Sequence, residues 1–104
     1  MQVLDESWAW FAQEFYSQYL SEKTYGLLLS NIPFISTHSY PLEILEKILG
    51  VEPHPFMDNF KTLKGDAKLF SEFVEKFMTN YDENYLLCKE WSDKANKILV
   101  NKLE

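Results

Sequence analysis

Residues 66–102 read DAKLFSEFVEKFMTNYDENYLLCKEWSDKANKILVNK, and this stretch decides the fold. Its apolar residues recur three and four positions apart, which is the period of one face of an α-helix. Asp66 stands where a helix N-cap belongs, and the segment Tyr81–Asn84 interrupts the pattern. We therefore predict two helices, over residues 67–80 and from Asp82 to about Lys102, packed as an antiparallel hairpin.

The two predicted helices differ in the width of their apolar faces. The apolar set of the first spans about half of the helix circumference, which predicts that this helix is the central one. Its members are Leu69, Phe70, Phe73, Val74, Phe77 and Met78. The narrower stripe of the second consists of Tyr85, Cys88, Trp91, Ala95, Ile98 and Leu99. The opposite side of the second carries the i,i+4 pairs Glu90–Lys94 and Asp93–Lys97, which mark a solvated face.

Upstream of residue 66 the pattern predicts shorter elements. Pro41 has the position of a first-turn proline, and the helix that follows it stops at Gly50. The segment Val51–Pro55 is predicted to be extended because its two prolines forbid a helix. Residues 56–64 are expected to form another short helix.

The N-terminal third is less regular. A helix over residues 5–21 is predicted from the spacing of Trp8, Phe11, Ala12, Phe15 and Tyr19. Residues 24–31 are expected to form a short helix that stops before Pro33, with a short strand through Ile32–Ile35 as the competing interpretation. The fold predicted is thus all-α: one domain over residues 1–104, built as a compact bundle of four to six helices.

The composition excludes several classes of function. Hydrophobic residues make up 46% of the chain and aromatic residues 16%, which is enough for a dense core. The formal net charge is −6, and every basic residue is a lysine. Nucleic acids and anionic membranes bind clustered Lys and Arg, so we expect neither as a partner. Because the sequence shows no secretory signal and no apolar run that could span a bilayer, we expect a cytoplasmic protein.

No residue pattern points to catalysis or to a metal. His38 and His54 have no metal-ligand spacing with each other or with Cys88, and both are expected to be solvated or to brace loops. Cys88 lies on an apolar stripe, where a thiol has a raised pKa and is inert. The three glycines are too far apart for a phosphate-binding loop. We therefore expect no enzyme activity, no cofactor and no metal.

Aromatic residues within acidic segments favour a protein partner. Interface hot spots are rich in Trp and Tyr, and a negative surface steers a basic partner. Trp10 points away from the apolar face of its predicted helix, and the alternative is that it packs against the short second helix or the terminal strand of chain. For Tyr81 and Tyr85 the alternative is a position at the edge of the core. The candidate partner-binding residues are Trp10, Glu14, Tyr81, Asp82, Glu83, Tyr85, Glu90 and Asp93.

In size, charge and helicity the chain resembles the small acidic immunity proteins that bacteria pair with secreted nuclease or contact-dependent toxins. The resemblance involves no shared motif, so it assigns no residues. It implies an inhibitor that binds and neutralises a basic protein, such as a bacterial nuclease toxin. The alternative is a self-associating helical regulatory or scaffold domain whose homodimer interface is the wide apolar arc of residues 67–81. The sequence leaves monomer and homodimer open.

Overall fold

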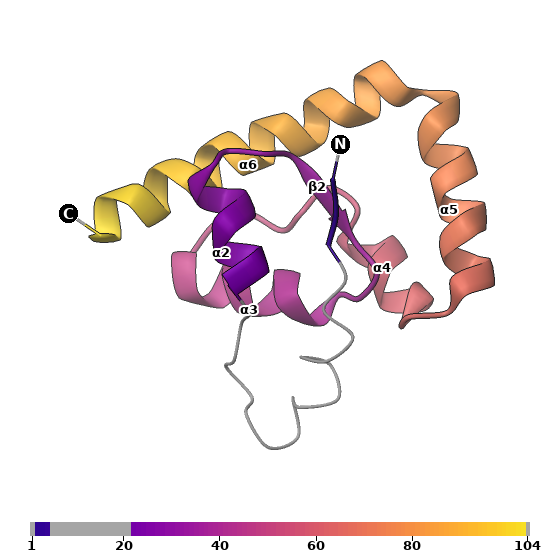
Figure 1. Ribbon diagram of the computed structural model, residues 1–104, viewed down its shortest axis with the longest axis horizontal. Helices are drawn as coiled ribbons and strands as arrows, with labels where there is room; N and C mark the ends of the chain where they lie inside the picture. Colours follow the sequence, from indigo (N-terminus) through magenta and orange to yellow (C-terminus); the bar gives the residue numbers. More distant parts are fainter. Residues whose placement is uncertain (1, 5–21, 104) are drawn as a thin grey trace.

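A computed structural model describes residues 2–4 and 22–103, which contain five helices and two short strands (Figure 1). In chain order these are β1 (Gln2–Leu4), α2 (Glu22–Leu29), β2 (Phe34–Ser36), α3 (Tyr40–Leu49), α4 (Met57–Leu63), α5 (Ala67–Thr79) and α6 (Tyr81–Leu103). The predicted all-α class, a compact bundle of four to six helices, is confirmed. The helix predicted over residues 5–21 lies outside the described residues.

The helices begin and end where local chemistry predicts. The Asp66 carboxylate accepts a hydrogen bond of 3.0 Å from the Leu69 N–H, which satisfies one free donor at the start of α5. Gly50 ends α3 in the left-handed conformation, with φ of 69°, and its N–H donates to the Glu46 carbonyl. The predicted bounds of α3 to α6 therefore agree with the structure to within one residue at each end.

Between residues 22 and 36 the structure contains both of the competing elements. The predicted helix is α2, and β2 follows it after Pro33. β2 pairs in parallel with β1, a strand that the sequence did not predict, and Val3 lies opposite Ile35 in the register. The parallel pair places the start of the chain beside the segment that leaves α2 (Figure 1).

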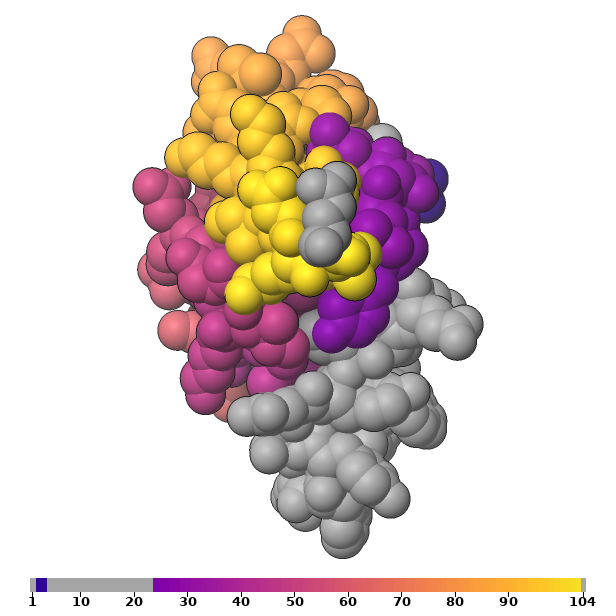
Figure 2. All heavy atoms as spheres, turned by 90° about the vertical axis from the view of Figure 1, so that its left-hand side faces the viewer, coloured from indigo at the N-terminus to yellow at the C-terminus, as the bar shows by residue number. Residues whose placement is uncertain are grey.

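α6 is the helix around which the other elements pack. It contacts α2, α3, α5 and β2, and Figure 2 shows its C-terminal part between α2 and α3. The prediction that residues 67–80 form the central helix is wrong. α5 lies at one edge of the molecule and buries only Phe73 and Phe77, whereas Leu69 and Met78, at the two limits of its apolar arc, are exposed (Figure 1).

The two C-terminal helices follow one another directly at Asn80. Their contact is concentrated at the junction, where the ring centroids of Phe77 and Tyr81 are 6.2 Å apart and the Asn84 side chain donates to the Phe77 carbonyl at 2.9 Å. From this corner the two helices diverge (Figure 1). The corner leaves much of the first half of α6 facing away from the rest of the fold.

His54 lies in the core. Its ring is within 6.2 Å, centroid to centroid, of the rings of Phe34, Phe60 and Trp91. The Phe56 N–H donates to Nδ1 at 3.2 Å, so Nε2 carries the proton and donates to the Phe34 carbonyl, also at 3.2 Å. Burial lowers the pKa of His54 to about 4, and the ring is neutral at pH 7. His54 therefore braces a loop, as expected, and the solvated alternative is wrong.

None of the helices within residues 22–103 combines the length and the apolar character that crossing a bilayer requires.

Candidate functional site

One side of α6 combines exposed leucines with exposed carboxylates. At about 100° per residue, Asp82, Glu83, Leu86, Leu87 and Glu90 fall within an arc of about 140°. Leu86 is 56% exposed and Leu87 46% exposed, and all three carboxylates are exposed. The opposite side of the helix is buried in the core through Cys88, Trp91, Ser92, Ala95 and Leu99. We call these five exposed residues the acidic leucine face.

The carboxylates of the acidic leucine face are unpaired within residues 2–4 and 22–103, where neither Asp82, Glu83 nor Glu90 forms an ion pair. The predicted pair Glu90–Lys94 is wrong, because the Lys94 ammonium instead lies 3.1 Å from Glu52 on the extended segment after α3. Three negative charges are therefore available to a partner along about two turns of helix.

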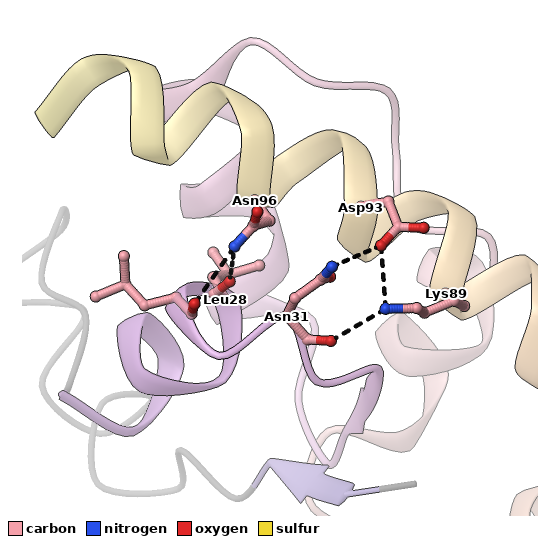
Figure 3. Close-up of polar contacts among 6 residues, drawn as sticks. Leu28, Asn31, Lys89, Asp93 and Asn96 are labelled. Atoms are coloured by element: carbon pink, nitrogen blue, oxygen red, sulfur yellow. Dashed lines mark hydrogen bonds and ion pairs between the residues drawn. The ribbon is translucent and has the colours of Figure 1, made fainter. Parts of the chain in front are cut away.

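Asp93 belongs to a different arrangement, which fastens α6 to the end of α2 (Figure 3). Its Oδ1 accepts from the Asn31 amide at 2.7 Å and lies 3.1 Å from Lys89 Nζ, which also donates to the Asn31 carbonyl at 3.3 Å. The Asn96 amide donates to the Leu28 carbonyl at 2.5 Å. The Asn96 bond adds a donor to a carbonyl in the last turn of α2, and the bonds of Asp93 and Lys89 hold Asn31 just beyond the end of that helix. Asp93 forms its ion pair with Lys89. The predicted pair Asp93–Lys97 is therefore wrong.

The hydrogen bonds from Asn31 and Lys89 lower the pKa of Asp93, so this carboxylate stays ionised where it accepts from the Asn31 side chain just beyond α2. Of the predicted partner-binding residues in the described part of the chain, Asp93 is the one with an intramolecular ion pair. Asp82, Glu83 and Glu90 are thus the carboxylates that the structure leaves for an intermolecular contact.

Asn96→Ala should lower the free energy of unfolding by about 1 kcal/mol. The substitution removes one of two donors to the Leu28 carbonyl, which keeps its hydrogen bond from the Asn31 N–H at 3.0 Å, so the loss is that of one part-buried hydrogen bond. Asn101→Ala is the matched control, because Asn101 lies on the same helix, is exposed, and its side chain makes no hydrogen bond within the described residues. Urea unfolding compares the two. Equal stability of both variants would show that the bond to α2 contributes nothing.

Tyr81 and Tyr85 lie between the acidic leucine face and the core. Both are half-buried; their ring centroids are 5.8 Å apart, and Tyr81 also packs against Phe77. They extend the aromatic core to the surface beside Asp82 and Glu83. Each therefore has a structural contact and an exposed part that a partner can reach. The remaining two predicted residues, Trp10 and Glu14, lie outside the described residues.

Two hollows flank the extended segment Val51–Pro55. A pocket of about 130 Å³ lies between this segment and α6, and is lined in part by Leu87, Glu90 and Trp91. A larger groove of about 850 Å³ lies on the side of α3 and α4. Small-molecule sites are mostly apolar with few polar groups, whereas this groove is lined by the charged residues Glu43, Glu46, Lys47, Asp58 and Lys61. The groove does not have the character of a small-molecule site.

Among the described residues, the potential metal ligands are dispersed and the cysteine is buried. Residues 2–4 and 22–103 contain no group of three or more His, Cys, Asp or Glu side chains placed to hold a metal ion. Cys88 is fully buried, and burial raises the pKa of its thiol to about 12, which keeps it protonated.

Leu86 and Leu87 were not among the residues predicted from the sequence to bind a partner. The signal was present, because Tyr85 and Cys88 were assigned to the buried stripe. At about 100° per residue, Leu86 lies about 100° from Tyr85 and Leu87 about 100° from Cys88, so both leucines point away from that stripe. Two adjacent leucines on the solvated side of a helix are the pattern that would have identified the centre of the face.

No known protein family, curated protein or solved structure matches this chain.

Proposed function

We propose that this chain is a protein-binding module that docks on a basic protein through the acidic leucine face. The observation that carries the proposal is a pair of exposed leucines, Leu86 and Leu87, bordered by three carboxylates without intramolecular ion pairs among the described residues. Protein interfaces have the same anatomy, with an apolar centre and a polar rim. Tyr81 and Tyr85 add aromatic surface of the kind enriched in hot spots.

The charge of the face specifies the charge of its partner. Asp82, Glu83 and Glu90 lie on one side of the helix in a chain whose net charge is −6. Such a surface attracts a positive partner during diffusion and repels a negative one. A basic surface often serves to bind nucleic-acid phosphates, so a protein that covers it blocks that activity. Neutralisation of a nuclease toxin, the role of an immunity protein, fits this chemistry.

A second copy of the chain fits the same face poorly. An antiparallel pairing of two α6 helices centred on the leucines places Leu86 opposite the second copy's Leu87. The same pairing places Glu83 opposite the second copy's Glu90, at both ends of the contact. Like charges at these positions oppose association. A basic partner meets the same carboxylates with favourable charge.

The test requires the natural partner. Immobilised wild-type chain and a Leu86→Gln, Leu87→Gln variant are used to capture proteins from the organism that produces the chain. A protein retained only by the wild type is then purified and its Kd measured by calorimetry. Raising the salt concentration from about 0.1 M to about 1 M shortens the Debye length from about 10 Å to about 3 Å. We expect the Kd to rise by about tenfold or more. A Kd that does not change with salt would contradict charge-directed docking.

A second candidate function, self-association through α5, has a specific observation in its favour. Leu69 is 40% exposed and Met78 is 56% exposed, on either side of the buried Phe73 and Phe77. A homodimer would cover this incompletely buried arc. Sedimentation velocity at micromolar concentration decides, because a strict monomer removes this function and a dimer that Met78→Lys dissociates supports it.

A further inference from the structure

We propose that the pocket between the extended segment and α6 receives a single Lys or Arg side chain of the basic partner. The inference rests on the proposed function and names one contact within it. The pocket has a volume of about 130 Å³ and adjoins the acidic leucine face, with which it shares Leu87 and Glu90.

The size of the pocket limits its occupant. Pockets for whole small molecules have volumes of roughly 300–1,000 Å³. A pocket of about 130 Å³ suits one long side chain. Because the occupant arrives on a protein that also contacts Leu86, the pocket is a subsite of a larger interface.

The lining of the pocket selects a side chain with an apolar stem and a positive end. Pro53, Pro55, Leu87 and Trp91 supply apolar surface, and Glu90 supplies a carboxylate with no ion pair among residues 22–103. Lys and Arg lay their methylene stems along apolar surface and keep the charged head at a polar edge. An acidic side chain would meet Glu90 with the same charge, and an apolar one would desolvate that carboxylate without compensation.

The pocket is held in shape by contacts that do not depend on a partner. Two prolines fix the φ angles of the extended segment. The Trp91 indole N–H donates to the Glu52 carbonyl at 2.7 Å, whereas the Lys94–Glu52 ion pair is exposed and contributes little to the shape of the pocket. A preorganised subsite costs little conformational entropy on binding.

Lys94 is the one cation among the described residues that line the pocket, and it forms an ion pair with Glu52. An incoming positive side chain therefore pairs with Glu90 and is repelled by Lys94. This arrangement gives opposite expectations for two neighbouring substitutions. Glu90→Gln should weaken binding of a cation, and Lys94→Gln should strengthen it.

The test uses synthetic peptides of defined sequence as probes. The tripeptide acetyl-Gly-Arg-Gly-amide is titrated into the full-length ¹⁵N-labelled chain, with the neutral citrulline peptide as the matched probe. The indole N–H of Trp91, assigned with Trp91→Phe, reports on the pocket. We expect a saturable shift of this signal with the arginine peptide and a Kd roughly two- to fivefold higher with the citrulline peptide, as for an exposed ion pair.

Variants then locate the contact. Glu90→Gln should raise the Kd of the arginine peptide to that of the citrulline peptide, and Lys94→Gln should lower it. Glu75→Gln is the matched control, because Glu75 is an exposed glutamate of α5 that belongs neither to the pocket nor to the acidic leucine face. Equal binding of both peptides to the wild type, or an equal effect of Glu75→Gln and Glu90→Gln, would overturn the assignment of the pocket.

Failure of the pocket and failure of the proposed function give different results. If the arginine peptide does not shift Trp91 while the natural partner still binds in a salt-dependent way, the subsite is wrong and the docking face stands. If the peptide binds as expected but the partner's Kd does not depend on salt, the subsite stands and the proposed function does not.

Discussion

Gly65→Ala is expected to lower the free energy of unfolding by about 3 kcal/mol, which is a large fraction of the stability of a domain of this size. Gly65 has a φ of +81°, a conformation that costs a side-chain-bearing residue about 1–2 kcal/mol. A Cβ at this position would also overlap the buried ring of His38, with Cε1 at only 2.9 Å. Overlap with a packed side chain adds about 1–3 kcal/mol.

The other two glycines provide matched controls that separate the conformational strain from the overlap with His38. Gly50 also has a positive φ, of +69°, but an added Cβ there meets no atom within 4 Å. Gly50→Ala should therefore cost only the conformational strain, about 1–2 kcal/mol. Gly26 lies within α2, again with no atom within 4 Å, and Gly26→Ala should stabilise the chain by about 0.5–1 kcal/mol.

Urea unfolding of the three variants should therefore rank Gly26→Ala as the most stable, Gly50→Ala next and Gly65→Ala last. If Gly65→Ala were no less stable than Gly50→Ala, the ring of His38 would not be packed against Gly65. That result would contradict the described path of the loop between β2 and α3, where the Gly65 N–H donates to the Thr37 carbonyl.

Acidification is expected to destabilise the fold through His54. Burial lowers its pKa from 6.5 to about 4 in the folded chain. Between these values the unfolded chain binds a proton that the folded chain does not, so stability falls as the pH decreases from 6.5 to 4. The contribution of His54 is complete above pH 6.5 and lost below pH 4. Its size is about 3 kcal/mol, from a pKa difference of about 2.5.

Glu46 opposes this trend in part. Its carboxylate accepts from the His54 backbone N–H at 2.6 Å, but partial burial outweighs that bond and raises its pKa. The stability that it contributes is present below its unfolded pKa and is lost as the pH rises through the folded one. Glu46 therefore offsets part of the loss of stability that His54 causes on acidification.

His54→Gln is the control for the pH dependence. Glutamine keeps an amide that can donate to the Phe34 carbonyl but does not titrate. We expect the variant to be less stable at pH 7 and its unfolding free energy to depend less on pH between 6.5 and 4, as measured by urea unfolding at several pH values. A wild-type chain whose stability does not change over this range would contradict burial of a neutral His54.

The sequence predicted where the helices begin and end better than it predicted which elements pack against one another. Caps and stops such as Asp66 and Gly50 act within a few residues, so the helix bounds followed from local chemistry. The position of α5 in the fold did not follow from local chemistry. The spacing of its apolar residues shows which ones share a face, but it does not show how much of that face another element covers, and Leu69 and Met78 stay exposed.

The polar contacts likewise depend on residues that are distant in the sequence. Lys94 has Glu90 one turn away, yet its ion pair is with Glu52, which is 42 residues distant in sequence. Asp93 binds Asn31, which is 62 residues distant. No local pattern encodes such partners. The candidate site could therefore be predicted only as a list of acidic and aromatic residues, and the structure was needed to separate Asp93, which fastens α2, from Glu90, which faces solvent.

α6 connects the fold to the proposed function. One side of the helix is held by the core through residues such as Trp91, and its C-terminal half is fastened to α2 by Asn96 and Asp93. The acidic leucine face is therefore presented on a fixed element. A rigid face loses little conformational entropy when a partner binds.

The most direct test of the docking face is a pair of charge reversals with the same net charge. Glu83→Lys, Glu90→Lys reverses the face, and Glu72→Lys, Glu75→Lys reverses two exposed glutamates of α5; each variant raises the net charge of −6 by four. Calorimetry with the basic partner should show affinity reduced roughly ten- to a hundredfold by the first variant and much less by the second. Equal losses would mean that only total charge matters, and would contradict a docking site on α6.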